Sequence, residues 1–228
     1  MKRYAGLLVG LAVALVCGRL GVWQLARRAE RRALNAVLEA RLAQPPLDLE
    51  AGMPFLSVPP DSLRFRRVRA AGRLDFSNQF IEIARSFQGA PGVHVLTPLR
   101  LSDGVGVLVD RGWTYSADGM TVDPAALREP DSTVVDGMFG LPSGRFGVGP
   151  DTLRVGYPLL PVVLRRTSPS PGMPQALRAV PPPTLDEGPH LSYAIQWFSF
   201  ATIALVGGAL LARRDTRERS AYLAGPRT

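Results

Sequence analysis

Cysteine, histidine and lysine are all scarce in this chain of 228 residues, and the shortages of cysteine and histidine exclude several kinds of metal and disulfide site. Cys17 is the single cysteine, so a disulfide framework, a thiolate zinc site and a paired-thiol copper site are excluded. His94 and His190 are the only histidines, and they do not form a His-x-x-x-His motif. Lys2 is the only lysine, so the net charge of +8 is carried by arginines, which stay protonated at physiological pH.

Signals of the common catalytic mechanisms are missing as well. The chain has no Gly-x-Ser-x-Gly motif, no phosphate-binding glycine loop and no pair of carboxylates arranged as an acid/base couple. Hydrophobic residues make up 46% and charged residues 20%, which excludes a chain that is disordered throughout. We therefore expect a folded protein that is not an enzyme, with a membrane-bound hydrolase as the remaining enzymatic alternative.

Two long apolar runs decide the predicted class. They cover residues 4–26 and 193–212, and each is close to the ~20 residues that a helix needs to cross a bilayer. We predict transmembrane helices at residues 4–26 and 190–212. Because many arginines lie at the ends of these runs, the positive charge indicates a membrane surface and membrane lipid rather than nucleic acid.

The first apolar run has two alternative interpretations. Lys2 and Arg3 followed by an apolar stretch are also typical of a secretory signal peptide, and residues 16–18 give a weak small-residue cleavage pattern. Cys17 allows a lipid anchor, although that site normally has a small residue before the cysteine and Val16 stands there.

Arginines after the second run predict the orientation. Only Arg178 lies near its start, whereas five arginines follow its end: Arg213, Arg214, Arg217, Arg219 and Arg227. Positive charge in short segments favours the cytoplasmic side. We therefore predict a multi-pass protein of the cell (inner) membrane, with both termini and the basic tail of residues 213–228 in the cytoplasm and the large loop outside.

The loop begins as a helix and then changes its period. Alanines at helical spacing extend the first helix over residues 27–44, and Pro45-Pro46 stops it. In residues 67–74 apolar positions alternate with arginines, which is the pattern of a half-buried strand with an arginine face. Further strand-length runs lie at residues 79–85, 92–99, 105–113, 133–139 and 160–167.

The remaining segments are predicted as a short helix, a loop and a linker. Asp123-Pro124 resembles a cap with a first-turn proline and opens a short helix to Glu129. Residues 143–156 hold four glycines and are predicted to form a loop, and residues 168–189 are proline-rich and read as a semi-extended linker. Six short strands with little helix predict an extracytoplasmic antiparallel β barrel or sandwich at residues 45–189, flanked by the two helices.

His190 lies where the second predicted helix meets the outer membrane surface. His190, Tyr193, Ala194 and Trp197 have the spacing of one helix face. An imidazole beside apolar and aromatic surface suits a metalloporphyrin, with His190 as the iron ligand. The alternative is an interfacial aromatic belt with a helix-start histidine. His94, in a strand, is expected to be structural.

The first helix carries a matching polar and aromatic cluster of Trp23, Gln24, Arg27 and Arg28. In antiparallel helices this cluster lies in the same leaflet as His190 and at a similar depth. We expect the two clusters to form one site, with Arg27 or Arg28 pairing with the propionates of the ring. Trp23 and its arginines have an alternative interpretation as an aromatic anchor.

Three segments carry a resemblance to a known family. They are Leu20-Gly21-x-Trp23-Gln24-x-x-Arg27, the run from Gly92-Val93-His94 through Asp110-Arg111-Gly112-Trp113, and His190-Leu191-Ser192-Tyr193-Ala194-Ile195-Gln196-Trp197-Phe198. In order and spacing they resemble the surfeit locus (Surf/Shy) family, apart from Asp110, where that family usually has asparagine. In the Arg111, Gly112 and Trp113 motif we expect either a Gly112 conformation closed to other residues or Trp113 packed across Gly112.

The resemblance implies a non-catalytic assembly factor for haem-copper cytochrome c oxidase. It implies that the protein assists the delivery of haem a to the catalytic subunit, with that subunit and haem a synthase as partners and His190 as the natural haem ligand. The alternative is a membrane scaffold that binds oxidase subunits without touching the cofactor.

Overall fold

Two compact units make up the chain. One contains Met1–Val37 and Leu185–Thr228, and the other contains Leu38–Thr184. The computed structural model describes residues 2–142 and 155–223, with side chains for residues 4–142 and 155–214. The predicted loop of residues 143–156 and the end of the predicted cytoplasmic tail fall mostly outside these ranges.

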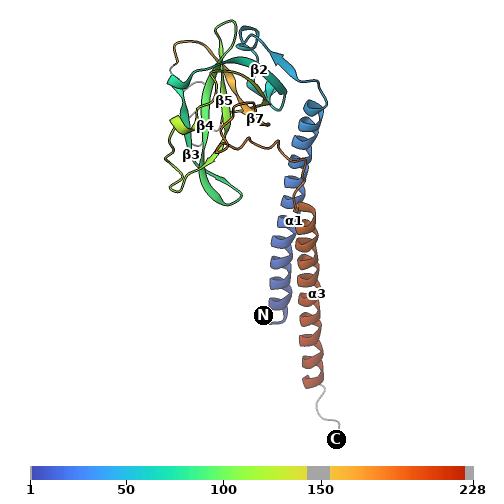
Figure 1. Cartoon of the computed structure of the whole chain (residues 1–228). Coiled ribbons are helices and arrows are strands. Elements are labelled where there is room, and N and C mark those ends of the chain that lie inside the picture. Colours follow the sequence, from blue (N-terminus) through green and yellow to red (C-terminus); the bar gives the residue numbers. More distant parts are fainter. Residues whose placement is uncertain (1, 143–154, 224–228) are drawn as a thin grey trace. The chain divides into compact units, whose positions relative to one another are not determined.

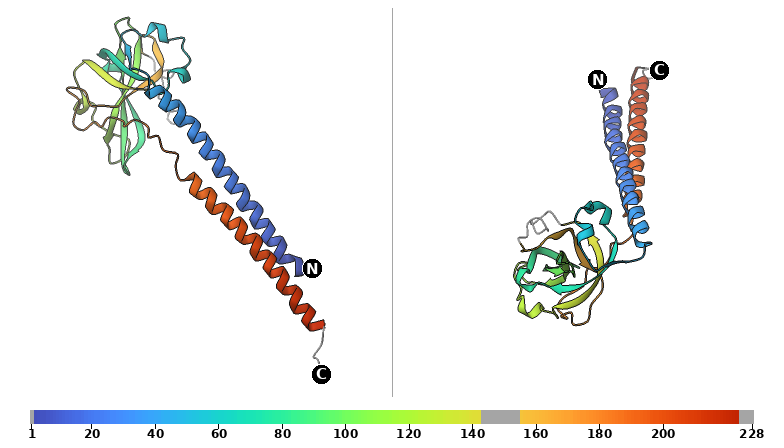
Figure 2. Two further views of the ribbon diagram at one scale, coloured as in Figure 1. Left: turned by 90° about the vertical axis from the view of Figure 1, so that its right-hand side faces the viewer. Right: turned by 90° about the horizontal axis from the view of Figure 1, so that it is seen from above.

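Two long helices form the first unit and lie side by side in antiparallel directions (Figures 1 and 2). They are α1 (Lys2–Leu42) and α3 (His190–Leu223). Helix α1 continues without a break past the apolar run and ends just before Pro45-Pro46, because proline lacks the N–H that a helix interior needs. Both helices are long and apolar enough to cross a membrane.

Small residues at heptad spacing bring α1 and α3 together. On α1 the stripe contains Gly10, Ala14, Cys17 and Gly21, followed by Gln24 and Arg28; on α3 it contains His190, Ala194, Trp197, Ala201, Ala204 and Gly208. A Cβ atom added at Gly10 would lie 2.6 Å from the carbonyl oxygen of Ala204, so only glycine allows this backbone contact. The spacing of about 3.5 residues keeps the stripe facing its partner along the helix.

The second unit is built on a seven-stranded sheet (Figure 1). Its strands are β1 (Leu47–Leu49), β2 (Arg67–Leu74), β3 (Phe80–Phe87), β4 (Ala90–Arg100), β5 (Gly106–Tyr115), β6 (Ser132–Gly140) and β7 (Leu159–Arg166). Short helices connect them: η1 (Met53–Phe55), α2 (Pro60–Leu63), η2 (Phe76–Asn78) and η3 (Ala125–Leu127).

The sheet is mixed, which corrects the prediction of a purely antiparallel one. Its order is β1-β2-β6-β7-β5-β4-β3, and the pairs β1–β2 and β5–β7 are parallel. Strand β2 pairs again with β4 at Arg73–Arg100 and Leu74–Leu99, so the pairings of β2, β6, β7, β5 and β4 run in a closed ring. Hydrophobic alternation does not reveal strand direction, which depends on the connections.

All six predicted strands are confirmed, with ends that differ by a few residues. In β2 the arginines of the alternating pattern are exposed, while Val68, Ala70 and Leu74 are buried. Strand β1 was missed because three residues beside prolines give no periodic signal. The predicted short helix that leads to Glu129 is present as the 3-10 helix η3. Its N-cap is Pro124, and the side chain of Asp123, one residue earlier, accepts from the backbone N–H of Ala125.

Strand β5 is buried on both faces, and this places it at the centre of the unit. Val107 and Val109 lie in the main hydrophobic core, whereas Leu108 packs on the opposite face with Leu96 and Val163. The main core also contains residues of β2, β4, β6 and β7 such as Val68, Leu99, Phe139 and Leu164. A strand covered on both sides reads as a continuous apolar run, as residues 105–109 do.

Part of the segment predicted as a linker packs on the sheet. Arg178 and Trp113 exchange two backbone hydrogen bonds of 2.8 Å, and the N–H of Val180 donates to the carbonyl oxygen of Arg166. Leu177 is buried against Val95 and Leu127. The proline-rich composition indicated extended backbone correctly but did not reveal that this backbone continues the sheet.

The Arg111-Gly112-Trp113 motif adopts the first of its two expected arrangements. Gly112 has a φ of +135°, and a Cβ atom there would lie 2.3 Å from the carbonyl oxygen of Arg178. The indole of Trp113 packs instead across Gly92, where a Cβ atom would lie 2.4 Å from the ring. Each glycine therefore leaves room for a different neighbour.

We expect Gly112→Glu to lower the free energy of unfolding by roughly 2–4 kcal/mol, because it combines backbone strain with a carboxylate beside a buried carbonyl. Thermal unfolding of the purified full-length chain measures this. Gly89→Glu is the matched control, since Gly89 also has a positive φ (+83°) but has open space around it. Equal unfolding midpoints for the two variants would contradict the steric argument.

Candidate functional site

The imidazole of His190 is hydrogen-bonded to the side chain of Gln24. His190 Nδ1 lies 2.8 Å from Gln24 Oε1, and both side chains are partly buried. His190 is the first residue of α3, and Gln24 lies on α1 one turn after Gly21, where the missing side chain makes room for the ring of Phe198. The structure thus brings together two of the residues that the sequence assigned to one site.

Two arginines on α1 bind the carboxylate of Glu187. Arg28 Nε lies 2.9 Å and Arg32 Nε 3.1 Å from the Glu187 oxygens, and Arg31 donates to the carbonyl oxygen of Asp186. Arg28 and Arg32 are four residues apart and share one helix face. Asp186 in turn accepts from the backbone N–H of Gly188 at 2.8 Å. These ion pairs and hydrogen bonds therefore hold the segment just before His190 against α1.

The other predicted site residues do not join His190. Arg27 pairs with Glu30 at 2.7 Å on the exposed side of α1. Tyr193 and Trp23 are 47% and 53% exposed and lie off the helix-facing stripes. Trp23 lines a shallow groove on α1 itself, with Arg19 among the lining residues. Trp197 is partly buried on the same stripe as His190, and its ring meets that of Phe200 edge-on.

The donors around His190 fit a haem group in part. No group of three or more histidine, cysteine or acidic side chains that could hold a metal ion occurs among the residues that the structure describes. A haem would bring its own ring nitrogens, and His190 would be the residue to offer an imidazole to its iron. Arg28 and Arg32 match carboxylates in charge and geometry, but their present partner is Glu187.

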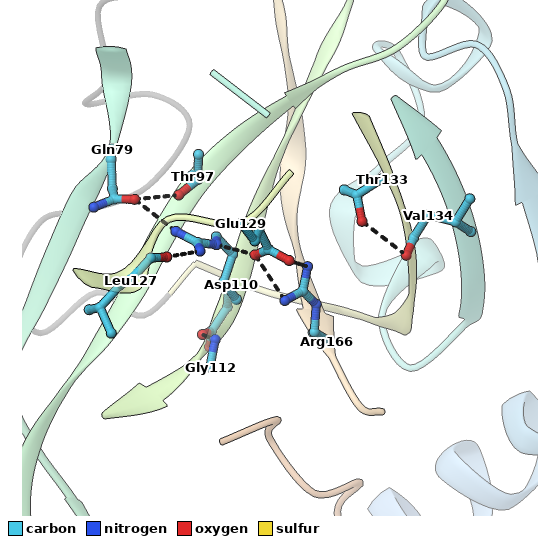
Figure 3. Close-up of polar contacts among 10 residues, drawn as sticks. Gln79, Thr97, Asp110, Gly112, Leu127, Glu129, Thr133, Val134 and Arg166 are labelled. Atoms are coloured by element: carbon cyan, nitrogen blue, oxygen red, sulfur yellow. Dashed lines mark hydrogen bonds and ion pairs between the residues drawn. The ribbon is translucent and has the colours of Figure 1, made fainter. Parts of the chain in front are cut away.

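A second polar cluster lies inside the sheet unit and was not predicted. The side chains of Arg111, Glu129 and Arg166 have no solvent exposure. Arg111 Nε donates to Glu129, and Arg166 donates to both Glu129 oxygens at 3.0 Å (Figure 3). One terminal nitrogen of Arg111 donates to the side-chain oxygen of Gln79 at 2.8 Å, and the other terminal nitrogen of Arg111 donates to the carbonyl oxygen of Leu127.

A β-bulge aims Arg111 into this cluster. The register between β4 and β5 pairs Val95 with Gly112 and Leu96 with Asp110, so Arg111 is an extra residue with no partner in β4. Burial lowers the pKa of Arg111 below its ordinary value, while the charge of Glu129 opposes that shift. Each of these three charged side chains has an opposite charge in the cluster, although Arg166 Nε has no hydrogen-bond partner among the described residues. The pairing of these buried charges indicates a structural role.

His94 has the structural role that the sequence predicted for it. Its Nδ1 lies 2.9 Å from a carboxylate oxygen of Asp110, and Asp110 also accepts from the backbone N–H of Gly112 at 3.1 Å. Asp110 therefore links the imidazole to the glycine whose conformation the motif depends on.

The sequence did not reveal the partners of the predicted arginines. Glu129 and Arg166 carry no local signal, because they meet only through the sheet. Glu187 had a signal that went unused: an acidic pair, Asp186-Glu187, precedes His190, and a basic run of residues 27–32 follows the first apolar run. Opposite charges at adjoining ends of two antiparallel helices indicate an ion pair.

Comparison with known proteins extends over both units. A sequence model of the SURF1 family matches residues 11–202. An uncharacterised SURF1-like protein of Mycobacterium tuberculosis is 29% identical over 238 residues, which cover 96% of this chain and 86% of the relative. A SURF1-like protein of Monosiga brevicollis is 28% identical over 254 residues, covering 99% and 94%. Surfeit locus protein 1 of Mus musculus is 32% identical over 109 residues, covering 41% and 34%.

We expect Glu129→Gln to lower the free energy of unfolding by about 3–5 kcal/mol, because two buried guanidinium groups lose their counter-charge. The thermal unfolding midpoint of the full-length chain is the measurement. Asp131→Asn is the control: Asp131 also joins two arginines, Arg73 and Arg128, but these are exposed. A midpoint that falls no further for Glu129→Gln than for Asp131→Asn would show that the buried charges do not determine stability.

Proposed function

Because the chain belongs to the SURF1 family, we propose that it assists the assembly of a haem-copper cytochrome c oxidase and that haem a is the cargo it handles. The resemblance of its three motifs to that family carries the assembly role, and the His190 environment carries the haem assignment. The protein acts without catalysis: it receives haem a from its synthase and presents it to the catalytic subunit of the oxidase.

Membrane anchoring is part of the proposal. Both α1 and α3 expose most of their large apolar side chains, Leu8, Leu15, Ile203 and Leu210 among them. In water such continuous exposure is unfavourable, whereas lipid accommodates it. The arginines after the second run favour a cytoplasmic tail, and two spans then put both termini in the cytoplasm and the sheet unit outside.

The environment of His190 is the observation that supports haem handling. Its imidazole is partly buried at the first turn of α3, and Arg28 and Arg32 bind the acidic residue that lies just before this turn. When bound, haem a supplies an iron that accepts an axial imidazole, a long apolar tail that prefers lipid, and propionates that need water and cations. Arg28 and Arg32 are the residues to hold a propionate, provided that it replaces Glu187.

A scaffold function is the second candidate, and a specific observation favours it. Gln24 satisfies His190, Glu187 satisfies Arg28 and Arg32, and Glu30 satisfies Arg27. The site is therefore a stable connection between the two helices even without cargo. In this alternative the sheet unit binds oxidase subunits and the cofactor is never contacted.

The proposed membrane anchoring leads to a prediction for the N-terminus. We expect the mature protein to keep its first apolar run, because α1 is one continuous helix and its Gly6, Gly10 and Gly21 lie against α3. Intact-mass analysis and N-terminal sequencing of the protein purified from membranes measure this. A mature chain that begins at Arg19 would show that the run is a signal peptide and would remove the contacts of Gly6 and Gly10.

The proposed haem handling leads to a prediction for His190. We expect His190→Ala to lose most of the haem a that co-purifies with the protein and to lower haem a occupancy of the oxidase in cells. The other histidine gives the matched control, since His94→Gln removes an imidazole that lies in the sheet unit beside Asp110. Optical spectra and haem extraction are the measurements. Unchanged haem content and oxidase occupancy in His190→Ala would favour the scaffold.

A further inference from the structure

We propose that Gln24 is a positioning residue for His190: its amide oxygen accepts the Nδ1 hydrogen, so that the imidazole presents the lone pair of Nε2 to the iron of haem a. This inference rests on the proposed haem function and adds to it the residue that selects the ligating nitrogen.

The geometry supplies the first argument. Gln24 Oε1 lies 2.8 Å from His190 Nδ1, within the range of a good hydrogen bond. Both residues lie on the facing stripes of α1 and α3, and the backbone contacts of Gly10 with Gly208 hold those stripes in register. The hydrogen bond therefore joins two rigid helices and does not depend on the conformation of a loop.

The chemistry of the pair supplies the second argument. A neutral imidazole has one N–H and one lone pair, and an amide oxygen has no hydrogen to donate. With the oxygen of Gln24 toward Nδ1, that nitrogen carries the hydrogen and Nε2 keeps the lone pair, which is the form that ligates a metal. An amide turned the other way would donate to Nδ1 and leave the hydrogen on Nε2, where it blocks ligation.

The glycine next to the imidazole supplies the third argument. Gly188 lies next to the imidazole, and a Cβ atom there would be 3.5 Å from Nε2. Gly188 has a φ of +70°, a conformation that favours glycine. The residue that begins the turn into α3 thus adds no side chain beside the ligating nitrogen.

Gln24 has an uncharged side chain, which suits a carrier that must release its cargo. Many metal-binding histidines donate to a carboxylate, which makes the imidazole a stronger ligand. Two carboxylates are close in sequence, but Glu187 binds Arg28 and Arg32 and Asp186 accepts from Gly188, so neither is the partner of Nδ1. The amide fixes the orientation of the ring without strengthening its bond to iron.

The tautomer can be measured without any haem. We would label the full-length chain with ¹⁵N-histidine, purify it in detergent micelles and record the nitrogen shifts of both imidazoles at a pH where they are neutral. We expect the Nδ1–H tautomer at His190 in the natural protein and its loss in Gln24→Leu. His94, whose Nδ1 faces Asp110, is the internal reference and stays Nδ1–H in both. An Nε2–H tautomer at His190 in the natural protein would overturn the proposal.

Haem binding gives the second readout. Titrating haem a into the same micelles, we expect about tenfold weaker binding for Gln24→Leu, as for other residues that orient a metal-binding histidine. Gln24→Glu should bind more tightly and shift the reduction midpoint to lower potential, because a carboxylate makes the imidazole a stronger donor. Gln196→Leu is the control: it removes a glutamine that is exposed on α3, and this variant should bind haem a as the natural protein does.

The outcomes distinguish a failure of this inference from a failure of the proposed haem function on which it rests. One outcome is that the natural protein binds haem a and His190→Ala does not, while both Gln24 variants match the natural protein in affinity and reduction midpoint. In that case the haem function stands and the proposed role of Gln24 is wrong. If the natural protein binds no haem a, the proposed function fails and this inference fails with it. Weak binding by Gln196→Leu equal to that of Gln24→Leu would show a general effect on the helices, which also overturns the role of Gln24.

Discussion

The carboxylate of Glu129 sits between two arginines that have no contact with solvent, and the sheet unit is organised around it. Arg111 comes from β5 and Arg166 from the end of β7, two parallel neighbours in the middle of the sheet. Glu129 comes from the connection before β6. A buried charge is tolerated only with a partner, so these three segments must stay together. The bulge at Arg111 and the positive φ of Gly112 follow from aiming that arginine inward while the next residue contacts Arg178.

The helix unit depends on a different constraint, the close approach of two backbones. Glycine and alanine at heptad spacing remove the side chains that would hold α1 and α3 apart. The same stripes end in Gln24 and Arg28 on one helix and His190 on the other. Because the backbones are close, the side chains of Gln24 and His190 can reach each other. The contact between small residues therefore fixes the geometry of the hydrogen bond between these two side chains.

An assembly factor has to hold its cargo and give it up, and the proposed site has the chemistry for both. Its arginines already have a carboxylate partner in Glu187, so a propionate would exchange with that carboxylate instead of entering an empty site. Its imidazole is oriented by a neutral amide. Both features favour reversible binding, because the protein without cargo keeps its charges and hydrogen bonds satisfied.

Periodicity and length in the sequence by themselves determined the two long apolar helices, the six main strands and the exposed arginine face of β2, since each depends on residues close together in the chain. The family motifs also pointed to His190, Gln24 and the strained Gly112. Only the tertiary structure decided which strands are parallel, that Arg111 and Arg166 share Glu129, that Glu187 is the partner of Arg28, and that Tyr193 and Trp23 lie apart from His190. These facts depend on which distant segments become neighbours, and ionic and hydrogen-bonding partners chosen across such distances leave no period in the sequence.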